Sequence, residues 1–474
     1  MAMKLYRHQL DALELAKCGN IALFHDCGTG KTLTALHIIT HFKAMGQGPA
    51  LVVCPLSIIE AAWIEDCKRF TPELTIVSLW HKPSTHKRKN QLRTLAEDHD
   101  IYVANYETFK SLYPHICAKG FGVVFVDESS KMKNPKSQIT QALLSLAGIK
   151  CRSSKYKTDE IIPCRYPLSG TPAPNKQSEY WAQVKFVTGP GYKCFNDNFY
   201  AFRNRYFHAI PLGMTGQKMF KFRESMLTEF MNAMNPVTHI VCKSDVLDLP
   251  LQVHQIRKIY LSSSERKAYD TLKRDMILRH GNDTVLAQTA LTEIMKLRQL
   301  TSGFAYGEDG ATVQVGKSKL TELKALLDEI GNNQVIIWAN FKAEIALLFK
   351  ELVDCDALWS GSHDRNKTIR DFQNGNTQYL IANPQSAAHG LTFTNCNYAI
   401  YYSLNYSYEL QKQSQDRIHR IGQDNKCTYY YFIADNTIDE IVYKAVQQKS
   451  DLSRTVLSYL RTGTYATERR LQTA

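Results

Sequence analysis

One short stretch constrains the fold of this chain more than any other. Residues 26–32 read Asp-Cys-Gly-Thr-Gly-Lys-Thr, after an apolar run at 20–24 and before a helical pattern at 33–39. The order strand, glycine-containing loop and helix directs backbone N–H groups and the positive end of a helix dipole at one place, which suits a polyphosphate. The sequence therefore predicts a phosphate-binding loop (Walker A), with a coincidental turn before a helix as the alternative.

The residue types within the loop fit this chemistry. Gly28 and Gly30, which flank Thr29, let the backbone close around phosphate oxygens without a Cβ in the way. Lys31 can reach the β- and γ-phosphates, and Thr32 can ligate Mg²⁺ through its hydroxyl. The strict pattern has glycine at position 25, where this chain has histidine.

An acidic pair supplies the two carboxylates that ATP hydrolysis at such a loop requires. The apolar run 123–126 is followed by Asp127 and Glu128. One carboxylate can hold the Mg²⁺ shell while the other polarises the attacking water. Upstream of the loop, the amide of Gln9 can pair with an adenine edge, because it donates and accepts at once. From its position alone, however, Gln9 is better interpreted as a surface polar residue.

Two stretches of the chain alternate strand-like and helical patterns. Continuous apolar runs predict buried parallel strands, so the expected fold class is α/β. The runs lie at 50–54, 75–80, 101–104, 123–126 and 166–168 in the first stretch, and at 334–339, 379–382, 398–402 and 428–433 in the second. Between the two stretches, helical patterns carry interleaved aromatic and basic residues, and we expect those aromatic side chains to form core.

Composition bounds the partners and the compartment. The chain has 58 Lys and Arg against 45 Asp and Glu, a formal net charge of +13, which favours a polyanion partner only slightly over a basic protein without one. Its 12 cysteines form no Cys-x-x-Cys pair, which predicts reduced thiols and no structural zinc. Since we find no apolar run of transmembrane length and no apolar signal core, we expect no membrane association. The reduced thiols indicate an intracellular protein, for which we expect a cytoplasmic location with a nuclear one as the alternative.

The motifs in their order resemble those of the superfamily 2 helicases: Lys31, then Asp127-Glu128, then Ser169-Gly170-Thr171. The residues within and around these motifs are similar to those of the SNF2 (Swi2/Snf2) branch. Residues 127–134, Asp-Glu-Ser-Ser-Lys-Met-Lys-Asn, resemble its DEAH box, with Ser130 where the family has histidine. Further similarity covers its TGTP and ELW segments at 169–175 and 179–181, its aromatic segment at 199–207 and its linker at 243–250.

The strongest match is residues 413–423, Gln-Ser-Gln-Asp-Arg-Ile-His-Arg-Ile-Gly-Gln, which resemble SNF2 motif VI almost letter for letter. Arg417 and Arg420 are three residues apart, which places them on one face of a helix. Guanidinium groups stay charged and can neutralise the transferring γ-phosphoryl group. Residues 386–394 stand where the family has motif V and retain Gly390 and Thr394, although two of its glycines and its asparagine are replaced.

The resemblance implies two RecA-like lobes with helical insertions and an ATP site shared by the lobes. The implied ranges are lobe 1 at 1–190, helical insertions and linker at 191–310, lobe 2 at 311–455 and a C-terminal tail at 456–474. The implied catalytic residues are Glu128, Arg417 and Arg420. ATP is expected at Gln9, Gly28, Thr29, Gly30, Lys31, Thr32 and Asp127, with Mg²⁺ at Thr32 and Asp127. Coupling is expected through Ser169, Gly170, Thr171, Gly390 and Gln413.

The function that the resemblance implies is a DNA-dependent ATPase. It would move on duplex or branched DNA without reading sequence, as a bare motor like the small SNF2-type proteins of bacteria and phages. A strand-separating or branch-migrating helicase with the same ATP site is the first alternative. A nucleic-acid-binding scaffold that hydrolyses no ATP is the second, and it predicts the loss of at least one key residue. Those residues, Lys31, Asp127, Glu128, Arg417 and Arg420, are all present.

Overall fold

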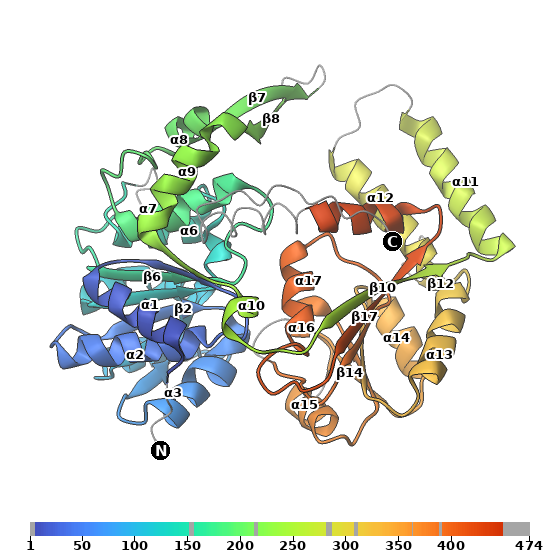
Figure 1. Cartoon of the computed structure of the whole chain (residues 1–474), viewed down its shortest axis with the longest axis horizontal. Coiled ribbons are helices and arrows are strands. Elements are labelled where there is room, and N and C mark those ends of the chain that lie inside the picture. The colour runs from blue at the N-terminus through green and yellow to red at the C-terminus, as the bar shows by residue number, and fades with distance from the viewer. Residues whose placement is uncertain are drawn as a thin grey trace. The chain divides into compact units, whose positions relative to one another are not determined.

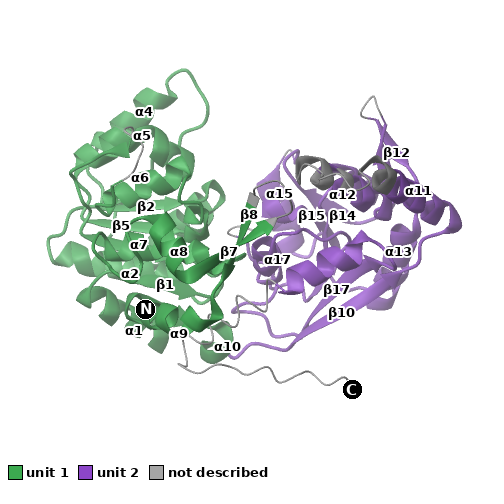
Figure 2. Cartoon of the chain, turned by 90° about the horizontal axis from the view of Figure 1, so that it is seen from above, with its two compact units in different colours: residues 1–211, 218–247, 451–474 green, residues 212–217, 248–450 purple. Residues whose placement is uncertain are grey.

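A computed structural model of the chain describes residues 5–150, 156–212, 217–280, 287–307, 311–362, 364–387 and 391–448. The chain forms two compact units, which Figure 2 distinguishes by colour. Unit 1 contains the chain up to Pro211 and Lys218–Leu247. Unit 2 contains Leu212–Gln217 and Asp248–Ser450. Gly390 and the expected C-terminal tail lie outside the described residues.

Unit 1 contains a seven-stranded sheet whose paired neighbours are all parallel (Figure 1). Its order is β3-β4-β2-β5-β6-β1-β9. The strands are β1 (Ala22–His25), β2 (Ala50–Cys54), β3 (Ile76–Ser78), β4 (Ile101–Asn105), β5 (Val123–Asp127), β6 (Cys164–Leu168) and β9 (Thr238–Val241). The phosphate-loop strand β1 pairs with β6 and β9, so its C-terminal end meets the ends of both neighbours.

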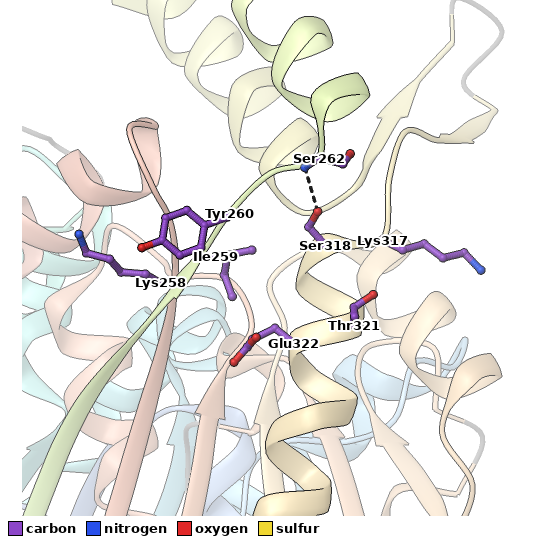
Figure 3. Close-up of a pocket in the computed structure, with 8 residues that line it drawn as sticks. All are labelled: Lys258, Ile259, Tyr260, Ser262, Lys317, Ser318, Thr321 and Glu322. Carbon is purple, nitrogen blue, oxygen red and sulfur yellow. Dashed lines mark hydrogen bonds between the residues drawn. The ribbon is translucent and has the colours of Figure 1, made fainter.

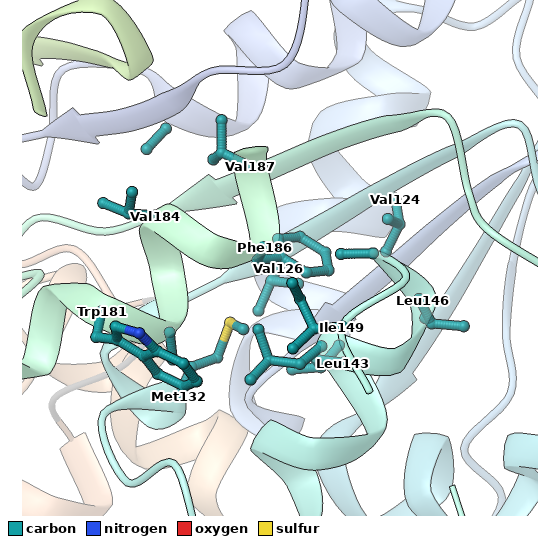
Figure 4. Close-up of a cluster of buried hydrophobic side chains, with 14 of the residues drawn as sticks. Val124, Val126, Met132, Leu143, Leu146, Ile149, Trp181, Val184, Phe186 and Val187 are labelled. Carbon is teal, nitrogen blue, oxygen red and sulfur yellow. The ribbon is translucent and has the colours of Figure 1, made fainter. Parts of the chain in front are cut away.

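Helices cover both faces of this sheet, which is why its strands read as unbroken apolar runs. One face packs on α1 (Arg7–Cys18), α2 (Lys31–Ala44) and α3 (Glu65–Phe70). The other packs on α5 (Tyr106–Lys119), α6 (Gln138–Leu146) and α7 (Tyr180–Thr188). Figure 4 shows part of the second core, where Val124 and Val126 of β5 lie among side chains of α6 and α7. The helix α4 spans Lys87–Ala96.

The aromatic segment after α7 forms core, as the sequence predicted. Phe195, Phe202 and Tyr206 are fully buried and pack against Phe230 in tilted and edge-on arrangements. The elements here are α8 (Phe199–Tyr206), the antiparallel hairpin β7 (Phe207–Leu212) and β8 (Gln217–Phe222), and α9 (Leu227–Met234). The hairpin was not predicted. The short helix α10 (Lys243–Val246) follows β9.

Unit 2 contains a six-stranded sheet, again with parallel neighbours, in the order β10-β17-β16-β13-β15-β14. Its strands are β10 (Gln252–Ile259), β13 (Val335–Trp338), β14 (Cys355–Leu358), β15 (Tyr379–Ala382), β16 (Tyr398–Tyr401) and β17 (Cys427–Ala434). Its helices are α11 (Ser263–His280), α12 (Ala287–Thr301), α13 (Ser318–Ile330), α14 (Lys342–Glu351), α15 (Arg365–Gln373), α16 (Pro384–Ala387) and α17 (Tyr408–Gln415). A small antiparallel pair joins β11 (Phe304–Tyr306) to β12 (Thr312–Gln314).

The expected α/β class with two parallel-sheet lobes is confirmed. Every strand expected from an apolar run is present in one sheet or the other. The sequence prediction missed β9, β10 and β14. Within the described residues, no helix combines the length and apolarity needed to cross a membrane.

Candidate ATP site

The predicted phosphate loop joins β1 to the first turn of α2, as its pattern requires. Gly28 and Gly30 adopt left-handed backbone conformations, with φ of 84° and 82°. At Gly30 a Cβ would also lie 2.4 Å from Nε2 of Gln9. The loop conformation therefore favours glycine at both positions, and at Gly30 a Cβ would also displace the end of the Gln9 side chain.

The Lys31 side chain lies across the loop. Its Nζ donates hydrogen bonds to the carbonyl oxygens of His25 at 2.8 Å and Asp26 at 3.1 Å. Burial lowers the pKa of Lys31. The neighbouring groups of Cys27, Glu128, Asp127 and Asp26 together raise this pKa by more, so the net shift is upward. The loop thus holds a positive charge close to the acidic pair.

The other predicted nucleotide-binding residues surround the same loop. Gln9 is only 1 % exposed, so the surface interpretation of this residue is wrong. Its Oε1 accepts from the Tyr6 N–H at 2.9 Å and its Nε2 donates to the Gly30 carbonyl at 3.4 Å. The Thr29 hydroxyl donates to the Asp26 carbonyl at 2.8 Å, so its hydrogen bond is made within the loop. Thr32 is partly exposed in the first turn of α2.

The acidic pair ends β5, and residues distant in sequence hold it. Asp127 accepts from the Trp63 indole at 3.1 Å and from the Glu128 N–H at 2.9 Å. The Tyr106 hydroxyl donates to the carbonyls of Asp127 at 2.7 Å and Glu128 at 3.1 Å. Burial raises the pKa of Asp127 above its ordinary value, although Lys31, Trp63 and the Glu128 N–H act in the opposite direction.

Glu128 occupies a left-handed conformation, with φ of 53°. Such a conformation is uncommon for a residue other than glycine, and the hydrogen bonds from Tyr106 help to hold it. Sequence reasoning missed Trp63 and Tyr106. Trp63 lies in the short helix η2 (Ile59–Ile64) and Tyr106 begins α5, and no local motif marks either residue. Their contribution is visible only once the sheet brings them to the end of β5.

The predicted coupling segment contacts the phosphate loop directly. Ser169 continues β6 and donates from its N–H to the Leu23 carbonyl of β1 at 3.2 Å. A Cβ on Gly170 would lie 3.0 Å from Sγ and 3.2 Å from the backbone nitrogen of Cys27. The Thr171 N–H donates to the Ser169 hydroxyl at 3.1 Å. The absence of a side chain at Gly170 is therefore what permits this close approach.

A buried hydrogen-bond chain also links the acidic turn to the coupling segment. The Ser129 hydroxyl, directly after the acidic pair, donates to Oε1 of Gln183 at 2.7 Å. Nε2 of Gln183 donates in turn to the Pro172 carbonyl at 2.7 Å. Both side chains are fully buried. Sequence reasoning missed Gln183, which lies in the interior of α7.

Three histidines lie at the base of the loop. Nε2 of His25 and Nδ1 of His239 are 2.9 Å apart, and Nε2 of His8 lies 2.9 Å from the Thr29 carbonyl oxygen. Burial, followed by the neighbouring His239, Lys31 and His8, lowers the pKa of His25 well below its ordinary value. The departure from glycine at position 25 is thus part of a buried cluster that joins α1, β1 and β9.

In unit 2, the two predicted arginines lie together just after α17. The expectation that they share one face of a helix is wrong, because α17 ends at Gln415 and both arginines lie in the turn that follows. Nη1 of Arg417 donates to the Leu391 carbonyl at 2.8 Å, and Nη1 of Arg420 donates to the same carbonyl at 3.3 Å. Nε of Arg417 also donates to the Gln413 carbonyl at 3.0 Å. Gln413 is 1 % exposed, and its amide oxygen and nitrogen have no hydrogen-bond partner among the described residues.

The structure therefore assembles the predicted residues in two groups. In unit 1, the loop around Lys31, the acidic pair and Gly170 meet at the C-terminal ends of β1, β5 and β6. In unit 2, Arg417 and Arg420 share one carbonyl. Their catalytic, binding and coupling roles remain predictions.

A separate hollow of about 400 Å³ lies in unit 2, between the end of β10 and the start of α13 (Figure 3). None of the predicted site residues lines it. Its charged groups pair with residues nearby: Lys258 with Asp435, Lys317 with Glu351, and Glu322 with Arg257. In Figure 3 the two lysines point away from one another, and Ser262 donates from its N–H to the Ser318 hydroxyl at 3.2 Å. We assign no ligand to this hollow.

Comparison with known proteins agrees with the motifs. Residues 8–303 match the family model for the SNF2-related domain, and residues 318–422 match that for the helicase conserved C-terminal domain. "Putative protein p41" of Acyrthosiphon pisum secondary endosymbiont phage 1 is 23% identical, over 92% of this chain and 93% of its own length. The "putative ATP-dependent helicase/translocase YwqA" of Bacillus subtilis is 23% identical, over 92% of this chain and 46% of its own length.

The chain spans less than two thirds of most of these relatives; it covers 39% of the yeast "ISWI chromatin-remodeling complex ATPase ISW1", for example. Among solved structures, the Sulfolobus solfataricus SWI2/SNF2 ATPase core in complex with dsDNA is 20% identical with a TM-score of 0.44, covering 98% of this chain and 96% of that one. The family model for the SNF2-related domain alone covers more than half of the chain. The protein therefore belongs to the SNF2-related family.

Proposed function

We propose that the protein is a DNA-dependent ATPase that translocates along duplex DNA without separating its strands. The observation that supports this most is the group in unit 1, where Lys31 lies in the field of Asp127 and Glu128 while Gly170 touches the loop that carries it. Because the Ser-Gly-Thr segment contacts the phosphate loop, a nucleotide bound to the loop would affect the position of that segment. The net charge of +13 supports a polyanion as the track.

ATP would bind to unit 1 through the phosphate loop. The backbone N–H groups around Gly28 and Gly30 would face the phosphates, and Lys31 would exchange its contacts with the His25 and Asp26 carbonyls for phosphate oxygens. Gln9, already against Gly30, stands at the edge of the loop where it can contact the base. Each of these residues thus contributes by binding and orienting the nucleotide.

Mg²⁺ fits the acidic end of β5. Asp127 is a buried carboxylate whose pKa is raised by burial, and a cation beside it would favour the charged form. A nucleotide-bound Mg²⁺ needs only one or two protein ligands besides phosphates and water, which Asp127 and the Thr32 hydroxyl would supply. The ion would offset charge on the β- and γ-phosphates.

Hydrolysis would need groups from both units. Glu128, held by Tyr106, would orient and polarise the attacking water. Arg417 and Arg420 would stabilise the charge on the transferring phosphoryl group when the two lobes close on ATP. Closure with ATP and opening with product release would then alternate the grip on the DNA backbone.

The proposal is tested by ATP turnover without nucleic acid and with single-stranded DNA, duplex DNA, forked DNA and RNA, each at two salt concentrations. Plain duplex should stimulate turnover most, and the concentration of duplex needed should rise steeply with salt, because phosphate contacts dominate such binding. Sequence should have little effect on stimulation. Lys31→Ala, which removes the phosphate contact, should abolish turnover with every nucleic acid.

Other outcomes would contradict the proposal in distinct ways. Stimulation mainly by forks or single strands would indicate a strand-separating or branch-migrating helicase. Stimulation by RNA alone would change the class of track. No turnover with any nucleic acid would indicate a binding scaffold, despite the presence of both the acidic pair and the arginines.

A further inference from the structure

Three buried tyrosines on the unit 2 sheet face the helix that leads to the arginine pair. Tyr429 and Tyr431 lie on β17, and Tyr401 ends the neighbouring strand β16. They are 0%, 0% and 2% exposed. The rings of Tyr401 and Tyr431 stack with centroids 5.0 Å apart and planes 6° from parallel.

Each tyrosine hydroxyl contacts the last turn of α17. The Tyr401 hydroxyl lies 2.7 Å from the Ser414 hydroxyl, and the Tyr429 hydroxyl donates to the Gln415 carbonyl at 2.9 Å. The Tyr431 hydroxyl accepts from Nε2 of Gln415 at 2.9 Å. Burial raises the pKa of all three phenols above the ordinary value, so the hydroxyls stay protonated at physiological pH.

The contacted residues are themselves bonded to the turn that carries the arginines. The Arg417 N–H donates to the Ser414 carbonyl at 3.3 Å. The His419 N–H donates to the Gln415 carbonyl at 3.3 Å, the same oxygen that Tyr429 contacts. The sheet is therefore joined, through Ser414 and Gln415, to the backbone N–H groups of Arg417 and His419.

We propose that Tyr401, Tyr429 and Tyr431 are positioning residues, whose hydroxyls hold the end of α17 so that Arg417 and Arg420 meet the transferring phosphoryl group in one fixed arrangement. This inference rests on the proposed function, because it assigns the two arginines to the ATP site. The tyrosines would not touch the nucleotide, because they are buried against α17. They act through Ser414 and Gln415. Their effect is to hold the two arginines in the geometry needed for the reaction, since small misplacements of catalytic groups reduce rates strongly.

The opposite face of the same strands supplies a matched control. Tyr430 on β17 and Tyr398 on β16 face the other core, against α13. Among the described residues, neither hydroxyl forms a hydrogen bond to the turn that carries the arginines. Tyr398→Phe with Tyr430→Phe therefore removes hydroxyl groups from the same two strands without touching α17.

The experiment compares wild type, the Tyr401→Phe/Tyr429→Phe/Tyr431→Phe variant and the control pair, all as full-length chains with saturating duplex DNA. Phenylalanine keeps the buried rings, so the sheet should still fold. The triple variant should lose about tenfold or more in kcat, with KM for ATP within about twofold of wild type. The control pair should match wild type in both constants.

Binding of ADP with and without aluminium fluoride, measured by calorimetry, separates positioning from a general structural role. The triple variant should bind ADP as wild type does but lose about tenfold in affinity for the ADP–aluminium fluoride complex, which mimics the transferring group. In an Arg417→Ala/Arg420→Ala background the three Phe substitutions should cause no further loss, because they act through those arginines.

An unchanged kcat in the triple variant, beside an active wild type, would overturn the inference and leave the proposed function intact. Equal losses of affinity for ADP and for the aluminium fluoride complex would overturn it as well, because they would indicate general damage to the fold. A wild-type protein without ATP turnover would instead overturn the proposed function itself.

Discussion

At the scale of single residues, the ATP site depends on contacts that are specific to this chain. Gly30 is confined by Gln9, Gly170 approaches Cys27, and His25 replaces the glycine of the strict loop pattern. The glycine pattern of the loop was readable from the sequence. Its packing partners could not be predicted, because only the tertiary fold brings Gln9 of α1 and Gly170 after β6 against the loop.

Gly30→Ala should impair the protein in two ways. A left-handed Ala costs about 1–2 kcal/mol in stability, and its Cβ would also displace Gln9, 2.4 Å away. Gly46→Ala is the control, because Gly46 has a φ of +71° but nothing within 4 Å of its Cβ position. Thermal unfolding should show similar strain in both variants, whereas ATP binding should fall only in Gly30→Ala. Wild-type ATP binding by Gly30→Ala would contradict the assignment of the loop.

The histidine cluster predicts a pH dependence of stability. Burial lowers the pKa of His25 and of His239 below the ordinary value for histidine, so both are neutral in the folded protein near neutral pH. Below about pH 6.5 the unfolded chain binds protons that the folded chain does not, and the free energy of unfolding should therefore fall as pH falls. Nearby, His8 and Lys31 oppose protonation of His25, while Asp11 favours that of His239.

Urea unfolding of wild type and of His25→Asn/His239→Asn at pH 7.5 and pH 5.5 measures this effect. The wild type should lose more stability between the two pH values than the double variant does. Equal losses in the two proteins would show that the cluster does not contribute.

At the scale of elements, side chains at the ends of strands and helices connect the motifs. The acidic turn after β5 reaches the turn after β6 through Gln183 of α7. In unit 2, β16 and β17 support the end of α17 through tyrosine hydroxyls. The apolar runs predicted these strands well, since buried parallel strands need no polar alternation. They could not predict which polar side chains on helices would bridge the strand ends.

The Ser129–Gln183 link should behave as one unit in a double-mutant cycle. Ser129→Ala and Gln183→Leu each leave a buried polar group without its partner, which should cost about 1–3 kcal/mol. The double variant should cost less than the sum, with a coupling of about 0.5–3 kcal/mol. Urea unfolding measures stability, and ATP turnover with duplex DNA shows whether communication is also lost. Strictly additive losses would mean that the two side chains act independently.

At the scale of the whole molecule, the sequence predicted two parallel-sheet lobes but not every strand within them. The strand β10 reads Gln-Val-His-Gln-Ile-Arg-Lys-Ile, and its charged side chains break the apolar run that marks the other strands. Arg257 and Lys258 instead pair with acidic residues beside it. The strand β9 lies in a stretch of helical pattern, and only its pairing with β1 identifies it. Long-range pairing was thus the information that local patterns lacked.

The proposed ATP-driven translocation also predicts that ATP binding and ATP turnover can be separated by one substitution. Glu128→Gln keeps the size of the side chain but removes the carboxylate that would polarise water. This variant should bind ATP as wild type does and lose at least about a hundredfold in turnover with duplex DNA. Calorimetry and a phosphate-release assay measure the two quantities. Turnover at the wild-type rate would exclude Glu128 as the group that activates water.

The most direct test of the central claim is displacement of a third strand from a triplex built on an intact duplex, with ATP present. The wild type should displace the third strand while the duplex stays paired, and Glu128→Gln should displace none, because movement requires hydrolysis. Rapid ATP turnover without displacement, or separation of the duplex strands themselves, would contradict translocation on duplex DNA.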